Sequence, residues 1–240
     1  MAVCMFQIVR DLYFISEHKV QQQKLREIAG TNDTEISHND KKHSQSADFH
    51  FLDQYMELYQ INPDLRGWLT IDGTEIDYPV MQSEDNDYYL EHSFYGKKNK
   101  YGCLFVKDFV DINSLETNFI VYGHNMKDGA MFGTLDKFQS EEYFKEHSEI
   151  YFYTFSEIRI YDIMAAFQIK LYDEEEDFKY YEFYQAENQE QFEYFYKNVM
   201  DRALYDTGMT AEFGDSFITL STCASQTNDS RFVLVGKLRN

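Results

Sequence analysis

The sequence predicts a mainly β fold to which helices have been added. Roughly seven or eight short segments rich in β-branched and aromatic residues alternate with turn-forming residues, a pattern typical of antiparallel strands. The dipeptide Asp72-Gly73 separates two of these segments and is a strong signal for a two-residue hairpin turn. One long segment, 188–205, instead has apolar residues at helical spacing. These observations indicate one β-rich domain with an added amphipathic helix.

The first fifty residues differ from the rest of the chain. Residues 11–28 predict a polar helix, and residues 30–46 are polar without periodicity, as in a flexible linker. We therefore divide the chain into a helix and linker, 1–50, and a folded domain, 51–240.

The elements of the domain are predicted from apolar spacing and from turn residues. Helices are expected where apolar residues recur every three or four positions, and strands where β-branched and aromatic residues form short runs. The expected helices are 51–59, 83–91, 138–147 and 188–205. The expected strands are 68–71, 74–80, 101–110, 118–122, 150–155, 158–171, 217–222 and 232–235.

Turn and capping residues indicate where several of these elements begin and end. The first helix of the domain should end at 62–64, which reads Asn-Pro-Asp. Ser140 is the expected N-cap of the third helix, because Glu141 follows it and acidic residues are favoured in a first turn. A tight connection is expected at 156–157, between two strands.

Composition limits the partners of this protein. The net charge is −20 and the isoelectric point is about 4.6, which excludes nucleic acid as a partner because phosphate binding relies on clustered Lys and Arg. The three cysteines, Cys4, Cys103 and Cys223, are too scattered for a disulfide framework or a zinc cluster. The histidines are equally dispersed, so we expect no metal and no cofactor.

A cysteine and an arginine flank the last predicted turn. The strand 217–222 leads into Cys223, and Arg231 precedes the final strand, with small and polar residues between them. Opposing Cβ atoms of paired strands lie about 5 Å apart, so the guanidinium would reach the thiol, whose pKa a nearby cation lowers. The alternative is that Cys223 is a small buried apolar residue, which is the role we expect for Cys103 within the strand 101–110.

Two motifs resemble those of one known family. The segment 219–223, TLSTC, followed by Arg231 at the head of an apolar strand, resembles the active-site signature of the sortases. The segment 122–135, YGHNMKDGAMFGTL, resembles the histidine segment of class B sortases and places His124 at the end of a predicted strand. The resemblance covers the chain from about Phe51 to its C-terminus.

The resemblance implies both a fold and a reaction. The fold would be an eight-stranded β-barrel with N-terminal helices and a long helix inserted before the cysteine strand. The protein would be a cysteine transpeptidase in which Cys223 attacks a carbonyl of a sorting-signal peptide and forms a thioacyl enzyme. His124 would act as general acid and then general base, and Arg231 would orient the substrate and offset the charge of the tetrahedral intermediate.

The resemblance also implies partners and further binding residues. The acceptor would be the amine of a peptidoglycan precursor, so that the cleaved protein becomes joined to the cell wall. Four residues match positions of the substrate groove of the family, although each also has a plainer explanation as a cap, a core contact or a strand residue: Asn86, Leu90, Tyr122 and Ser221.

Residues 1–9 have two interpretations. The apolar run ends at Arg10, well short of the roughly 20 residues that span a bilayer, so it fits an ordinary helix start. The resemblance instead implies the C-terminal remnant of a membrane anchor, most of which would be absent from this sequence. We therefore expect a protein on the extracellular face of the cell membrane, held there by a single N-terminal anchor.

Two other functions remain open. An L,D-transpeptidase-like cell-wall cross-linker also uses cysteine, histidine and arginine, but it keeps histidine and cysteine within one motif, whereas His124 and Cys223 are far apart. A non-catalytic extracellular adhesion or scaffold domain would have the same β-rich, acidic composition.

Overall fold

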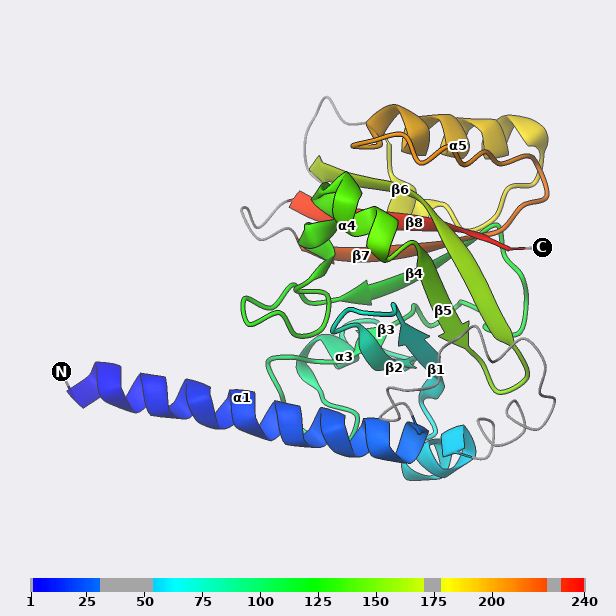
Figure 1. The fold of residues 1–240 in the computed structure, drawn as a ribbon. Helices are drawn as coiled ribbons and strands as arrows, with labels where there is room; N and C mark the ends of the chain where they lie inside the picture. Colours follow the sequence, from blue (N-terminus) through cyan, green and yellow to red (C-terminus); the bar gives the residue numbers. More distant parts are fainter. Residues whose placement is uncertain (1, 31–53, 171–177, 224–229, 240) are drawn as a thin grey trace. The chain divides into compact units, whose positions relative to one another are not determined.

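The computed structural model describes residues 2–30, 54–170, 178–223 and 230–239 (Figure 1). The chain forms two compact units, Met1–Pro63 and Asp64–Asn240. The expected linker at 30–46 lies almost entirely outside the described residues. The predicted division between 1–50 and 51–240 therefore stays a prediction.

The first unit is helical. Helix α1 (Ala2–Ala29) is continuous, and a second helix spans residues 54–61. Leu25 and Ala29 near the end of α1 are fully buried, as is Leu58 in the second helix. The helix predicted from residue 11 thus begins earlier, because the apolar residues before it continue the same helix.

The structure corrects the expectation of a membrane anchor. No helix in the described ranges combines the length and the apolar character needed to cross a bilayer. In α1, the apolar start is followed by charged residues such as Arg10, Asp11 and Glu17. The expectation of a protein held at the extracellular membrane face by a single N-terminal anchor is therefore contradicted.

The second unit is a closed eight-stranded barrel, as predicted (Figure 1). Its strands are ordered β1-β2-β3-β4-β7-β8-β6-β5 around the barrel. Their bounds are β1 Leu65–Thr70, β2 Asp77–Met81, β3 Leu104–Phe105, β4 Asn118–Gly123, β5 Glu149–Tyr153, β6 Ile158–Lys170, β7 Phe217–Cys223 and β8 Ser230–Leu238. The shorter helical elements are α3 Tyr88–Glu91, η2 Leu135–Gln139, α4 Glu141–Glu146 and η3 Tyr180–Glu182.

Several boundaries follow from local sequence. A turn at Asp72-Gly73 joins β1 to β2, with Gly73 at φ 72°, but the connection is longer than the two residues predicted, because β1 ends at Thr70 and β2 begins at its partner Asp77. Ser140 is the N-cap of α4, and its side chain accepts a hydrogen bond from the Tyr143 amide. Where turn chemistry is local, the sequence is a sufficient guide.

The strand predicted at 101–110 is wrong for most of its length. Only β3, residues 104–105, pairs with its neighbours. Gly102 adopts φ 58°, which ends extended structure before β3. After β3, the carbonyl oxygens of Lys107 and Val110 accept hydrogen bonds from the Gln82 side chain instead of from a strand.

Helix α5 (Gln189–Arg202) covers the outer face of the barrel and precedes the cysteine strand, as predicted (Figure 1). Asn188 caps it by accepting from the Gln191 amide. Its apolar side packs against buried sheet residues such as Phe217 and Val233. The buried residues of this side are Phe192, Phe195 and Val199, each worth on the order of 1.5–3 kcal/mol by apolar burial. Residues of β6, β7 and β8 on the outer face of the barrel are therefore buried beneath this helix.

Replacing Gly102 with alanine should destabilise the barrel beyond the cost of its backbone conformation. An added Cβ would lie 2.3 Å from the Tyr89 carbonyl oxygen. Gly208 has a similar φ of 73° but nothing within 4 Å of the corresponding Cβ. We expect Gly208→Ala to lower the free energy of unfolding by about 1 kcal/mol. Gly102→Ala should lower it by about 2 kcal/mol more. If urea unfolding shows the same loss of unfolding free energy for both variants, the packing of Gly102 against the Tyr89 carbonyl is not tight.

Candidate active site

Backbone pairing brings the three predicted catalytic positions together on β4, β7 and β8, which are neighbours in the barrel (Figure 1). β4 and β7 are parallel, with Tyr122 opposite Ser221 and Gly123 opposite Thr222. His124 directly follows Gly123, and Cys223 directly follows Thr222. β7 and β8 are antiparallel, and Cys223 lies opposite Arg231. Because neighbouring strands lie about 4.8 Å apart, the three backbone positions form one row across three adjacent strands.

The loop after β4 holds the backbone of His124 in place. The carbonyl oxygen of His124 accepts a hydrogen bond from the Phe132 amide at 2.9 Å, and Asn125 forms an isolated bridge with Met131. Gly123 permits the approach of Phe132, because a Cβ at residue 123 would lie 2.9 Å from Phe132 Cδ2. The loop 124–132 thus folds back on itself directly after the strand.

The Leu90 carbonyl oxygen orients the His124 ring. It lies 2.8 Å from His124 Nε2. A carbonyl oxygen only accepts, so Nε2 is the protonated nitrogen of this hydrogen bond. Nδ1 therefore remains the nitrogen that can take up or release a proton during a reaction. Leu90, predicted to bind substrate, has this backbone role in the structure.

Helix α3, which presents Leu90, is fixed by the segment before β3. The Cys103 amide donates to the Tyr89 carbonyl at 2.8 Å, and Gly102 packs directly against the same carbonyl. Tyr101 also donates to the Asp128 carboxylate in the histidine loop. One short segment therefore contacts both the histidine loop and the helix that orients the ring.

Tyr122 and Ser221 form a hydrogen-bonded wall beside the catalytic row. The Tyr122 hydroxyl lies 3.1 Å from that of Tyr184, and the Ser221 Oγ lies 2.7 Å from the Tyr180 hydroxyl. Burial raises the pKa of Tyr122, with the neighbouring Tyr184 adding to the effect. Burial likewise raises the pKa of Tyr184 to about 12. Both phenols therefore remain neutral near pH 7.

Arg231 lies on the same side of the sheet as this wall. Ser221 is opposite Val233, which packs under α5 on the outer face of the sheet. Arg231 precedes Val233 by two residues. Successive side chains alternate between the faces of a strand, so Arg231 shares the outer face. Its positive charge lowers the pKa of Tyr122, although less than burial raises it. The side chain of Cys223 and the predicted turn after it lie outside the described residues.

Asn86, predicted as a substrate contact, hydrogen-bonds to Asp108 in the structure, and its contact with substrate stays a prediction. Its Nδ2 donates to the Asp108 carboxylate and its Oδ1 accepts from the Asp108 amide, both at 2.9 Å. The predicted helix 83–91 is confirmed only over α3, and Asn86 lies in the turn before it. In this structure Asn86 holds the segment after β3.

Several residues near the catalytic row were not identified from the sequence. Tyr180 and Tyr184 come from the segment before α5. Phe105 stacks on the Tyr122 ring, and Lys107 places its Nζ over the same ring. None of these residues belongs to a motif. Their roles depend on strand pairing between distant segments.

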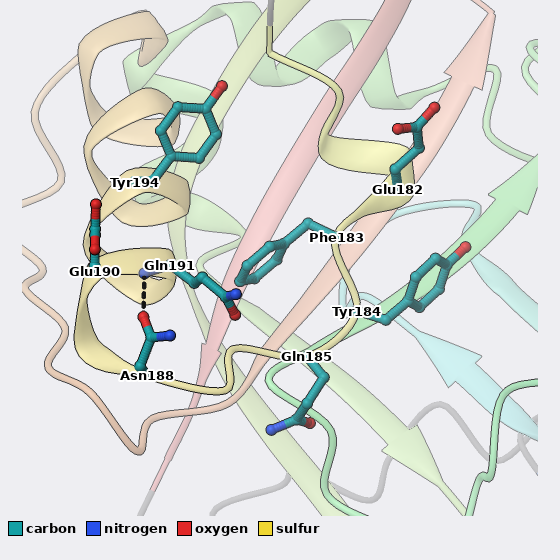
Figure 2. Close-up of a pocket in the computed structure, with 8 residues that line it drawn as sticks. All are labelled: Glu182, Phe183, Tyr184, Gln185, Asn188, Glu190, Gln191 and Tyr194. Carbon is teal, nitrogen blue, oxygen red and sulfur yellow. Dashed lines mark hydrogen bonds between the residues drawn. The ribbon is translucent and has the colours of Figure 1, made fainter.

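A surface cleft of about 660 Å³ opens between residues 182–185 and α5 (Figure 2). Phe183 points toward α5, where it stacks on Phe195, whereas Tyr184 points away from the helix. The charged lining residues are Glu182 and Glu190, so the cleft favours cationic or neutral ligands. Tyr184 borders this cleft and also contacts Tyr122, which links the cleft to the catalytic wall.

Cys103 has the packing role that was predicted. Its side chain is buried, and burial raises the pKa of its thiol well above the usual range, so it stays a neutral thiol. Within the described ranges, no three His, Cys, Asp or Glu side chains cluster in a way that would hold a metal ion. The absence of a metal from the whole protein stays a prediction.

Sequence comparison identifies relatives over most of the chain. Residues 69–239 match the family model of the sortase domain. The chain is 37% identical to sortase B of Listeria monocytogenes over 192 residues, which is 78% of this chain and 74% of that protein. It is 26% identical to sortase B of Staphylococcus aureus over 79% of this chain and 76% of that protein.

Solved structures share the same fold. Sortase B from Bacillus anthracis in complex with AAEK2 superposes with a TM-score of 0.76 at 30% identity, covering 94% of this chain and 98% of that one. A mutant form of Clostridium perfringens sortase B also gives a TM-score of 0.76, at 28% identity, covering 91% and 96%. The chain therefore belongs to the sortase family and, within it, to the class B sortases, which makes it a cysteine transpeptidase.

Proposed function

We propose that the chain cleaves a sorting-signal peptide through a thioacyl enzyme and transfers the acyl part to an amine of a peptidoglycan precursor. Sortases act on sorting-signal peptides, which supports the donor class. The observation that supports the assignment of residues is the row of His124, Cys223 and Arg231 across β4, β7 and β8.

In the first half-reaction, the proton of the Cys223 thiol passes to His124 Nδ1, and the thiolate sulfur attacks the carbonyl carbon of the scissile peptide bond. The carbonyl oxygen becomes an oxyanion, and its collapse breaks the carbon–nitrogen bond and leaves a thioester on Cys223. His124 donates a proton from Nδ1 to the leaving amine, because Nε2 is already committed to the Leu90 carbonyl.

In the second half-reaction, the acceptor amine attacks the thioester carbonyl. His124 Nδ1 removes a proton from the amine, a new amide forms, and the thiolate of Cys223 is released. Water is the competing acceptor, and its attack yields a free carboxylate.

Arg231 offsets the negative charge that develops in both half-reactions. Its guanidinium is charged at every working pH and donates through a planar fork, so it can orient the carbonyl oxygen as well as stabilise it. Its position opposite Cys223, with its charge acting on Tyr122, supports this role.

Tyr122, Ser221, Leu90 and Asn86 contribute to the donor site in different ways. Tyr122 and Ser221 form its wall through their hydroxyl partners, whereas Leu90 acts on His124 through its carbonyl oxygen. Asn86 acts indirectly, through Asp108. The sortase family match does not favour the two other functions considered, an L,D-transpeptidase-like cross-linker or a non-catalytic scaffold.

Trapping the thioester tests the first half-reaction. Wild-type protein incubated with a panel of sorting-signal peptides, without an acceptor amine, should gain the mass of the acyl fragment on the peptide that contains Cys223. Hydroxylamine should release that mass as a hydroxamate. Cys223→Ala should give neither product, whereas Cys103→Ala should behave as wild type. Cleavage that survives in Cys223→Ala would rule out the mechanism.

Substitution of Arg231 should affect the rate and not the fold. Removal of one oxyanion donor costs about 2.7–4 kcal/mol in barrier height, so Arg231→Ala should lower kcat on the order of a hundred- to a thousandfold. Arg231→Lys keeps the charge without the planar fork and should retain an intermediate rate. Arg10→Ala, at an exposed position of α1, is the matched control. Equal activities of all three variants would exclude Arg231 from the reaction.

A further inference from the structure

The segment 107–110 presents a cation and an exposed ring beside the catalytic wall. Lys107 Nζ lies 5.8 Å from the centroid of the Tyr122 ring. Phe109 packs edge-on against Tyr184, with ring centroids 4.7 Å apart, and yet remains 58% exposed. None of the catalytic steps described above uses either residue.

The same segment is held rigidly by one glutamine. Gln82 Nε2 donates to the carbonyl oxygens of Lys107 at 2.7 Å and Val110 at 2.8 Å, while its Oε1 accepts from Arg66 Nε at 2.8 Å. Asn86 adds its two hydrogen bonds to the residue between them. An irregular segment is thus fixed without belonging to a strand, so the position of Lys107 relative to Tyr122 is set by side-chain hydrogen bonds.

The spacing of residues along β4 and β7 indicates how far Lys107 lies from the scissile bond. Tyr122 precedes His124 by two residues, and Ser221, which is paired with Tyr122, precedes Cys223 by two. Two residues of extended chain cover about 7 Å. A donor peptide lying along this edge would therefore bring a side chain two or three residues from the scissile bond to Lys107.

The positive charge of Lys107 determines which peptide side chain would bind beside it. The chain has a net charge of −20, but at physiological salt an exposed charge acts over only about 8 Å, so nearby groups decide what binds. Lys107 makes no ion pair within the described residues. An acidic peptide side chain would find a cation here.

We propose that Lys107 is a specificity-determining residue that selects an acidic side chain two or three residues from the scissile bond, and that Gln82 is the positioning residue that holds it. Phe109 supplies the apolar surface next to the ammonium. This inference rests on the proposed function and defines one feature of its donor peptide.

A charge-reversal experiment tests Lys107. Starting from the best peptide of the thioester panel, Asp, Asn and Lys are placed in turn at the second and third residues on each side of the scissile bond, and kcat/KM is measured. At one of these positions, wild type should prefer Asp over Lys by about threefold, the size of an exposed ion pair. Lys107→Glu should reverse the preference, and Lys107→Met should abolish it. Lys97→Glu, an exposed residue of another loop, is the matched control and should keep the wild-type preference.

Gln82→Leu tests the positioning role. It should reduce the preference for Asp as Lys107→Met does, and the change in kcat/KM should come from KM. A variant that only folds less well would lose active protein, which lowers the rate on all peptides by the same factor and leaves their ratio intact. If wild type cleaves the peptides but shows no acidic preference at any of these positions, or if Lys107→Glu leaves that preference unchanged, this inference is wrong while the proposed function stands. If wild type cleaves no peptide, the proposed function is wrong and the inference falls with it.

Discussion

The backbone hydrogen bonds that pair β4 with β7 and β7 with β8 are the constraint on which the site depends. His124 and Cys223 belong to distant parts of the chain, and only the parallel register of β4 and β7 makes them neighbours. The antiparallel register of β7 and β8 then sets Arg231 opposite Cys223. A slip of one residue in either pairing would turn every side chain of a strand to the other face and separate the row. The closed barrel prevents such a slip, because each of these strands is bonded on both sides.

Contacts outside the three strands then give the row its chemistry. Leu90 sets the tautomer of His124, and Gly102 allows the segment before β3 to hold the helix that contains Leu90. On the other side, Tyr180 and Tyr184 satisfy the hydroxyl groups of Ser221 and Tyr122. The side chains proposed to react, at the ends of strands, are therefore held by a second layer of hydrogen bonds, which is how a site on a rigid scaffold keeps its geometry.

Local signals predicted much of this fold, and non-local contacts account for what was missed. The hairpin at Asp72-Gly73 and the N-cap at Ser140 are encoded by a few adjacent residues, and the motifs around His124 and Cys223 identified the catalytic candidates. The strand expected at 101–110 failed because Gln82, from an earlier strand connection, takes the carbonyl groups that a strand would use. Asn86 and Leu90 were selected by position in a motif, which does not reveal that one binds Asp108 and the other acts through its carbonyl oxygen.

An engineered disulfide tests the central claim most directly. Disulfides require Cα atoms about 4.4–6.8 Å apart, which matches neighbouring positions of paired strands. In His124→Cys, mild oxidation should join residue 124 to Cys223, detected by peptide mapping as a cross-linked pair that reduction separates. Lys127→Cys, on the exposed part of the same loop, should not form this pair. Failure of the 124–223 bond to form, or its formation from residue 127 equally well, would contradict the adjacency of His124 and Cys223.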